Sequence, residues 1–381
     1  MATSAAAARV PVTRLVSLDV FRGATMAAMV LVNNPGDWGN VYAPLLHAEW
    51  HGWTPTDLIF PFFLFIVGVA MTLSRATLGP WGRILRRGAT IIGLGALLAG
   101  FPYFPLATWR IPGVLVRIGV CYLTATALFR WTLPAGPRND RTHAARLAWL
   151  AVLLALGYWA AMVLAPFPGH VPGDLSPEGN FAAFIDRAVI GQAHMYRQRG
   201  WDPEGLASTV PAVATVLLGL LTGFWLRAGV EARAKAAVLA AAGLAVLALG
   251  LLWDLAFPIN KNLWTSSFVA FTGGSAALAL AACYYLVDVT GWRWWTKPFV
   301  ILGVNAITLY VLAGASARLL GILKVTGPEG TPVSVQRFIY LSWFAPLADP
   351  KNASLLFAFS YLVVLFVILY TMYRRGIYIK A

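Results

Sequence analysis

The chain has 381 residues, of which 59% are hydrophobic and only 12% are charged. Soluble proteins carry about 25% charged residues, so a core able to hide this much apolar surface from water would need a far larger protein. The composition therefore excludes a disordered chain, a disulfide-rich secreted chain and a nucleic-acid-binding domain. It indicates a polytopic membrane protein whose first partner is the lipid bilayer, and we expect no nucleic acid.

Apolar segments of about 20 residues, enough to cross roughly 30 Å of hydrocarbon, recur along the whole chain. They lie near 15–33, 57–78, 87–104, 111–131, 145–165, 206–228, 235–257, 264–288, 298–320 and 354–373. We therefore expect an all-α fold, a single bundle of about ten transmembrane helices that forms one domain over residues 1–381. The main external loops are expected at 34–56, 166–205 and 321–353.

The net charge of +14 is distributed unevenly between the gaps. If the N-terminus is cytoplasmic, eighteen of the 29 Lys and Arg residues lie in cytoplasmic gaps and nine in external ones, while Arg22 and Arg117 lie within spans. The positive-inside rule then places both termini, including the tail 1–14, in the cytoplasm. We interpret the basic face mainly as a contact with anionic lipid head groups.

Cysteine usage predicts neither a disulfide nor a metal site. The only two cysteines, Cys121 and Cys283, fall inside predicted helices, and neither belongs to a C-x-x-C pair. Small residues in predicted spans, such as Gly219 and Gly223, indicate helix faces that approach one another closely in lipid. We expect no metal.

The polar chemistry is concentrated in the first external loop, residues 33–57, which contains no Lys or Arg. It holds Asn33, His47, Glu49 and Asp57 among tryptophans that suit the membrane interface. A histidine near carboxylates is typical of a general base with an orienting partner, and an amide can stabilise an oxyanion.

Two structural alternatives compete with this interpretation. His47 is also compatible with a plain interfacial histidine. Thr54-Pro55-Thr56-Asp57 fits a helix start, with Thr54 as the N-cap, proline at the first helical position and an acid three residues after the cap. Capping and catalysis are compatible, because a carboxylate fixed at a helix start is also a rigid partner for an imidazole.

Two more polar segments, 184–205 and 253–264, are expected on the same membrane face as His47. Three polar loops above a bundle with embedded polar side chains favour a functional site. The alternative is that these residues are ordinary polar residues of solvent-exposed loops. The embedded residues are Asp19, Arg22, Arg117 and Asn305.

At these residues the chain resembles the heparan-α-glucosaminide N-acetyltransferases and their bacterial relatives. The similarity runs in order over nearly the whole chain, and such a series is more specific than any single block. The matching blocks are S-L-D-V-F-R-G at 17–23, H-A-E-W-H-G-W-T-P-T-D-L-I-F-P-F-F-L-F-I-V-G at 47–68, R-I-P-G-V-L-V-R-I-G-V at 110–120, F-I-D-R-A-V-I-G-Q-A-H-M-Y at 184–196, W-D-P-E-G-L-A-S-T at 201–209 and N-K-N-L-W-T at 260–265.

The resemblance implies acetyl transfer from cytosolic acetyl-CoA to the amino group of a glucosamine-like sugar on the far side of the membrane. It places the family's active-site histidine at His47, its asparagine at Asn33 and its aspartate at Asp57. Asn34-Pro35 and Asp37 depart from the glycine-rich stretch of the lysosomal enzyme. We therefore expect an envelope amino sugar as the acceptor and the bacterial inner membrane as the location, and a homodimer stays one option for the assembly.

Candidate contacts follow for both substrates. For the acceptor they are Trp50, Glu49, His194, Asn260, Lys261 and Asn262. For acetyl-CoA they are Arg22, Arg83, Arg86, Arg87, Arg117 and Asn305, with lipid contact or ion pairing as the alternative for the arginines. In particular, Asp19 and Arg22 stand one helical turn apart and are able to neutralise each other.

Two mechanisms and three rival functions remain open. Either His47 deprotonates the amine, which attacks the thioester directly, or His47 itself carries the acetyl group. The rivals are a transporter, an O-acyltransferase acting on an envelope glycan and a membrane subunit with no activity of its own. The lack of an inverted repeat argues against the transporter.

Overall fold

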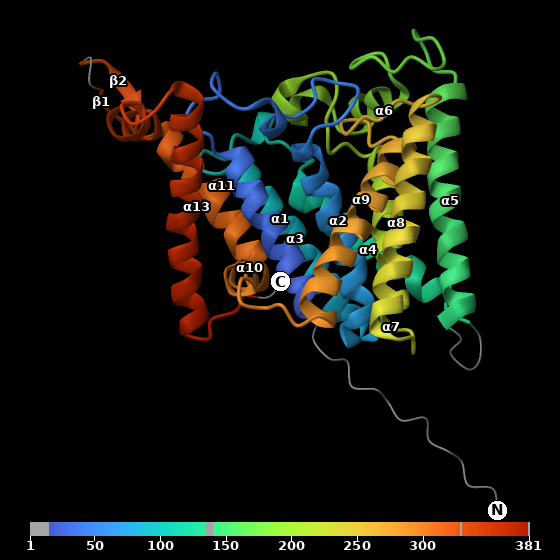
Figure 1. The fold of residues 1–381 in the computed structure, drawn as a ribbon. Coiled ribbons are helices and arrows are strands. Elements are labelled where there is room, and N and C mark those ends of the chain that lie inside the picture. The colour runs from blue at the N-terminus through green and yellow to red at the C-terminus, as the bar shows by residue number, and fades with distance from the viewer. Residues whose placement is uncertain (1–14, 135–139, 328–329, 380–381) are drawn as a thin grey trace, which may run out of the picture.

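A computed structural model of the chain describes residues 15–134, 140–327 and 330–379. The tail 1–14 therefore lies outside the described residues. Almost all regular structure in the described part is helical (Figure 1). The chain is an all-α polytopic membrane protein, as its composition predicts.

In the described part of the chain, eleven helices form the bundle, of which α10 is the shortest with nine residues, and short elements lie in the connections between them. The bundle helices are α1 (Val16–Asn33), α2 (Ile59–Leu73), α3 (Trp81–Gly100), α4 (Val114–Trp131), α5 (Asp140–Leu164), α7 (Thr209–Arg227), α8 (Ala232–Asp254), α9 (Ser266–Tyr284), α10 (Thr296–Val304), α11 (Ala306–Ile322) and α13 (Pro350–Arg374). The short elements include α6 (Phe181–Val189), α12 (Val335–Ile339) and an antiparallel hairpin of β1 (Lys324–Thr326) and β2 (Pro332–Ser334).

The structure corrects two of the expected spans. Eight helices of the described chain are long and apolar enough to cross a membrane, and α10 with α11 makes a ninth span only as a pair bent by 78°. The segment expected as one span at 298–320 is thus broken, at Asn305. The segment expected at 87–104 is α3, which begins six residues earlier, at Trp81, and so includes three exposed arginines in its first two turns. It is not among these nine spans, and termini on the same side of the membrane require α3 to cross as a tenth.

Close helix packing depends on the small residues, as predicted. A Cβ atom added at Gly219 of α7 would overlap the carbonyl oxygen of Phe65 in α2, and one at Gly223 would overlap the Thr72 hydroxyl. Lipid tails are as apolar as leucine, so helices associate through such close van der Waals contact rather than through water exclusion. The backbones of α2 and α7 therefore approach each other closely.

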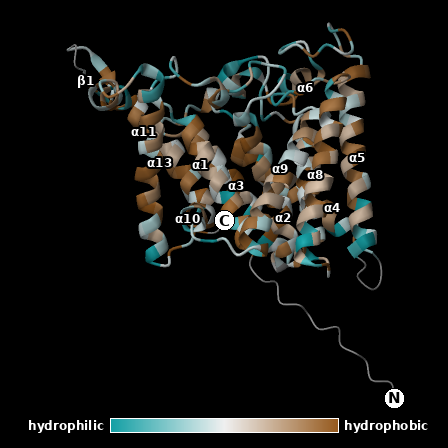
Figure 2. Cartoon of the chain, viewed as in Figure 1, coloured by the Kyte–Doolittle hydropathy of each residue, from teal (hydrophilic) through white to brown (hydrophobic). Residues whose placement is uncertain are grey.

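The helices divide into an inner and an outer set. The apolar segments of α7 and α9 are both 72% buried inside the bundle, whereas the apolar segments of α5, α8 and α13 are only 22–28% buried. The outer helices therefore present apolar side chains to lipid. Figure 2 shows hydrophobic residues along the bundle and hydrophilic ones at its two ends.

The polar loops gather at one end of the bundle. In Figure 1 the loop after α1, α6 and the β-hairpin all lie at the end opposite the connection between α7 and α8. The loop-rich end contains the three segments that the sequence singles out, and we propose, from the positive-inside rule, that it is the external end.

This topology can be tested with single cysteines. Glu49→Cys, in the exposed loop after α1, is expected to react with an impermeant thiol reagent in intact cells, while Glu231→Cys, in the exposed α7–α8 connection, is expected to react only after permeabilisation. The parent chain supplies the background from Cys121 and Cys283. The reverse labelling pattern would invert the orientation.

Candidate active site

The site begins with a buried carboxylate at the start of α2. Pro55–Leu58 forms a 3-10 turn that leads into α2, and Asp57 in this turn reaches back to accept a hydrogen bond from the backbone N–H of Thr54 at 3.0 Å. A second backbone donor, the N–H of Ala48, lies 3.1 Å from the same oxygen, Oδ2. The predicted cap is therefore confirmed, and Asp57 is only 1% exposed.

The other oxygen of Asp57 holds His47. Nδ1 of the imidazole lies 2.6 Å from Oδ1, while the side chain of His47 remains 48% exposed. The Thr54 hydroxyl donates to the carbonyl of Leu46 at 2.5 Å, and the Thr56 hydroxyl donates to the carbonyl of Pro44 at 3.1 Å. These bonds fasten the segment before His47 to the same turn. A proton on Nδ1, shared with the carboxylate, leaves the Nε2 lone pair free to accept another.

A lysine from a distant loop completes this cluster. Lys261, between α8 and α9, places its Nζ 3.1 Å from Nδ1 and 3.2 Å from Nε2 of His47, and 3.7 Å from Oδ1 of Asp57. Its side chain is 16% exposed. Burial lowers the pKa of Lys261 below its ordinary value, and the Asp57 carboxylate opposes that shift.

The loop that carries Lys261 is rigid and is joined to the His47 loop. The N–H of Asn260 donates to the Thr265 hydroxyl at 3.0 Å, and the Asn260 side-chain oxygen accepts from the N–H of Leu263 at 2.9 Å. Between the loops, the N–H of Gly52 donates to the carbonyl of Ile259 at 2.7 Å. The cluster of His47, Asp57 and Lys261 is therefore assembled from two tied segments.

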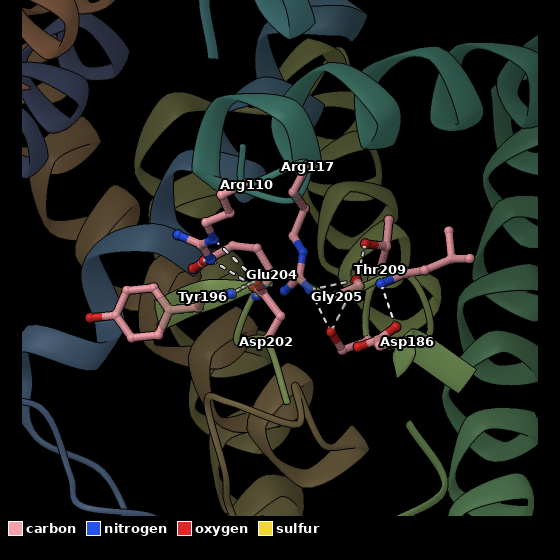
Figure 3. A network of polar contacts seen from close by, with 10 residues as sticks. Arg110, Arg117, Asp186, Tyr196, Asp202, Glu204, Gly205 and Thr209 are labelled. Atoms are coloured by element: carbon pink, nitrogen blue, oxygen red, sulfur yellow. Dashed lines mark hydrogen bonds and ion pairs between the residues drawn. The ribbon is translucent and has the colours of Figure 1, made fainter. Parts of the chain in front are cut away.

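A second polar network lies at the loop-rich end of the bundle, and its members Glu204 and Arg117 act on the charge of Lys261. Figure 3 shows this network from close by. Arg110 donates through Nε and Nη2 to both oxygens of Asp202, at 3.0 and 2.6 Å, and its Nη2 also lies 2.5 Å from Glu204. Burial works against the charge of Arg110, but the carboxylates of Glu204 and Asp202 outweigh it and raise the pKa of the guanidinium. This bidentate ion pair between Arg110 and Asp202 fixes the segment before α7.

Arg117 extends the network inward. It is 1% exposed, lies 5.1 Å above the ring of Trp264, and donates to the carbonyl of Gly205 at 2.9 Å and to the Ser208 hydroxyl. Figure 3 shows Arg110 and Arg117 reaching from one side toward the same loop segment. Arg117 therefore belongs with the loop-rich end of the bundle and not with the arginines at the start of α3.

Asp186, Asp202 and Glu204 were not predicted as site residues, although they lie in two of the segments that resemble the family. Asp186, in α6, accepts from the backbone N–H groups of Leu206 and Ala207 at 2.8 and 3.2 Å, and burial raises the pKa of its carboxyl to about 6. In the sequence, the signal for them is the pair of acids in W-D-P-E-G together with the basic residue Arg110, which lies in a different connection.

The remaining acceptor candidates do not all converge. Trp50 donates from Nε1 to the carbonyl of Leu175 at 2.8 Å and packs edge-on against Trp201 at 5.0 Å, while Glu49 beside it is exposed. Asn262 is half-buried next to Lys261. Asn260 is fully buried and approaches His51 at 3.4 Å.

Asn33 and His194 are less closely tied to the cluster. Asn33 is the exposed last residue of α1, and within the described residues no hydrogen bond joins it to His47. Nδ1 of His194 lies 2.9 Å from the carbonyl oxygen of Trp109, and the carbonyl of His194 accepts from the N–H of Ile111. These contacts join two other loops at the loop-rich end.

The acetyl-CoA candidates occupy separate places. Arg83, Arg86 and Arg87 are exposed in the first two turns of α3. Arg22 lies 3.6 Å from Asp19, as the ion-pair alternative predicts. Asn305 is buried at the break between α10 and α11, where it hydrogen-bonds the backbone of 377–379. The structure therefore does not gather these residues into one pocket.

Comparison with known proteins agrees with the resemblance seen in the sequence. Residues 14–167, which contain His47 and Asp57, match the family described as heparan-alpha-glucosaminide N-acetyltransferase, catalytic. The human heparan-alpha-glucosaminide N-acetyltransferase is 31% identical over 352 aligned residues, which cover 78% of this chain and 52% of the human protein. The chain is related to the heparan-α-glucosaminide N-acetyltransferases.

The mouse enzyme of the same name gives a similar result, 31% identity over 353 residues that cover 78% of this chain and 53% of the mouse protein. The chain thus spans about half the length of the curated relatives that it matches. The match extends beyond the catalytic family segment, and this agrees with a site that draws Lys261 from a part of the chain outside residues 14–167.

The Arg110 network predicts a loss of stability when its cation is removed. Arg110→Leu leaves the buried carboxylates of Asp202 and Glu204 without their ion partner, so the free energy of unfolding is expected to fall by about 3 kcal/mol. Thermal unfolding in detergent measures this. Arg197→Leu is the matched control, because Arg197 is exposed and stacks on the same Tyr196 ring as Arg110. Equal effects of the two substitutions would contradict a structural role for the Arg110 ion pairs.

Proposed function

We propose that this protein is a membrane-bound N-acetyltransferase that moves an acetyl group from cytosolic acetyl-CoA to the amino group of an extracytoplasmic, glucosamine-like sugar. The observation that carries the proposal is the His47–Asp57 pair, a half-exposed imidazole bound at 2.6 Å to a buried carboxylate, in a chain related to N-acetyltransferases. The pair lies at the loop-rich end of the bundle, where a polymeric sugar has access.

The chemistry requires a base that works near neutral pH. A protonated amine is not a nucleophile, so His47 first accepts a proton from the acceptor amine at Nε2 while Asp57 holds the proton on Nδ1. The amine nitrogen then forms a bond to the thioester carbon. As the tetrahedral intermediate collapses, the carbon–sulfur bond breaks and the thiolate of CoA leaves. The bonded nitrogen loses its second proton, which protonates the thiolate, and the half-exposed His47 releases the first proton to solvent.

The surrounding side chains suit the two substrates. In the proposed roles, Asn33 donates to the oxyanion of the intermediate, and the ring of Trp50 with the exposed Glu49 binds the sugar, whose face is apolar and whose amine is cationic. Asn262 adds a polar contact from the Lys261 loop. Two arguments support these roles: the resemblance to the acetyltransferase family, and the position of these residues at the loop-rich end of the bundle.

The proposal needs a protein passage, because neither substrate crosses hydrocarbon. Acetyl-CoA carries several phosphate charges, and Arg83, Arg86 and Arg87 form an exposed cationic group at the end of α3 away from the sugar site. Phosphate contacts there would let the thioester extend into the bundle toward His47. We place the protein in a bacterial inner membrane, with both termini in the cytoplasm.

A second route passes the acetyl group through His47 itself. The imidazole is exposed enough to attack a thioester, but an acetyl-imidazole at the wet end of the bundle is open to hydrolysis, which favours direct transfer. The routes differ in the absence of acceptor. Only the acetyl-histidine route releases a burst of CoA stoichiometric with enzyme.

Turnover by the purified protein tests the function. We expect acetyl-CoA consumption with glucosamine and none with glucose or N-acetylglucosamine, because these two lack a free amine. Turnover with glucose would support the O-acyltransferase instead.

The site assignment is tested by His47→Ala. The variant is expected to insert and fold normally, since His47 is half exposed, and to lose at least about 100-fold in kcat with glucosamine, the usual contribution of a general base. His170→Ala is the matched control, because His170 lies in a different loop at the same end of the bundle, where its ring stacks on Phe167. Full activity of His47→Ala would refute the assignment.

A further inference from the structure

The position of Lys261 relative to the imidazole is unusual. Its Nζ is almost equidistant from the two ring nitrogens of His47, at 3.1 and 3.2 Å. An ammonium in the ring plane at these distances would overlap the carbon between the nitrogens, so Lys261 lies over the ring face. The in-plane lone pair of Nε2 therefore stays free for a substrate proton.

We propose that Lys261 is a positioning residue that holds His47 in its neutral, proton-accepting form. The inference deepens the proposed function and rests on it, because only an acceptor of protons needs to be kept neutral. It assigns to Lys261 an action on the base rather than the sugar contact expected from the sequence.

The electrostatic argument compares the two protonation states of the imidazole. A cation over the face of a neutral aromatic ring is attracted, whereas a cation beside an imidazolium is repelled. Asp57 acts in the opposite direction, since a carboxylate at 2.6 Å favours the imidazolium. With both partners present, the neutral ring lies between one negative and one positive charge, and protonation would give the cluster of His47, Asp57 and Lys261 a net positive charge.

Other charged groups act on the cluster through Lys261. From the segment before α7, Glu204 favours the ammonium, and from α4, Arg117 disfavours it. On the loop of His47 itself, Glu49 is exposed, and His51 interacts with Asp254 from the end of α8. None of these groups touches the imidazole within the described residues, so Asp57 and Lys261 are the charges that matter most there.

The orientation of Lys261 is built in rather than incidental. Its neighbour Asn260 is fully buried and hydrogen-bonded within the loop, and the Lys261 side chain is only 16% exposed. The ammonium also lies 3.7 Å from the Asp57 carboxylate, which keeps it near the ring. A lysine meant mainly to bind sugar would need more of its donors open to solvent.

The test measures the protonation of His47 directly. Diethyl pyrocarbonate acylates a histidine through its neutral imidazole and not through the imidazolium, and peptide mapping by mass spectrometry gives the initial rate at each histidine of the full chain in detergent as a function of pH. In Lys261→Met, the Asp57 carboxylate still favours the imidazolium form of His47, and no neighbouring ammonium opposes it. We expect the midpoint of His47 modification to move up by about one pH unit, so that reaction on the acid side becomes about tenfold slower.

Two further variants and one internal reference make the result specific. Lys261→Arg keeps a cation able to stack on the ring and is expected to keep the parent midpoint. Lys351→Met is the matched control, because Lys351 lies over the ring of Tyr42 at 5.8 Å, away from His47. The midpoint of His170 modification, measured in the same samples, should be the same in the parent chain and in every variant. A His47 midpoint in Lys261→Met that is unchanged or lower would overturn the proposal.

The activity profile separates this proposal from the proposed function. In Lys261→Met the acid limb of kcat/KM for glucosamine should move upward with the modification midpoint, and in Lys261→Arg it should not. A raised KM with an unmoved acid limb would make Lys261 a sugar contact and overturn the proposal. A shifted midpoint in a protein that transfers no acetyl group to any amino sugar would refute the function while the electrostatic role of Lys261 stood.

Discussion

The buried carboxylate of Asp57 is the constraint on which the site depends. A carboxylate that is 1% exposed would lose several kcal/mol of hydration if it had no partners. Here it has two backbone donors, the His47 imidazole and the nearby ammonium of Lys261. One side chain therefore starts α2, fixes the loop before it and orients the candidate base, so local folding and chemistry cannot be separated at this position.

The same principle, in which a buried charge is satisfied by parts of the chain far apart in sequence, organises the rest of the loop-rich end. Arg110 joins the connection before α4 to the acids before α7, and Arg117 binds the backbone of the same segment. The loops are thereby held above a bundle whose α2 and α7 approach through glycines. A hydrogen-bonded loop end over closely packed helices suits the proposed reaction between substrates from opposite sides.

Much of this was predictable from the sequence. Apolar length gave the helical class, and T-P-T-D gave the cap because its signals lie within four residues. The break at Asn305 was not predictable, since the apolar run continues through it and the bend depends on contact with residues 377–379. The contact between Lys261 and His47 joins residues 214 positions apart, so the sequence suggested a shared face but not that Lys261 lies over the imidazole. The proposed role of Asn33 still rests on the resemblance.

The central claim is that one chain joins an acetyl donor and an amine acceptor across a membrane. Sealed proteoliposomes with labelled acetyl-CoA on one side only and glucosamine on the other side only test it most directly, with liposomes containing His47→Ala as the blank. The account predicts labelled N-acetylglucosamine in the compartment that received no acetyl-CoA. Product that forms only when both substrates share one compartment would contradict it.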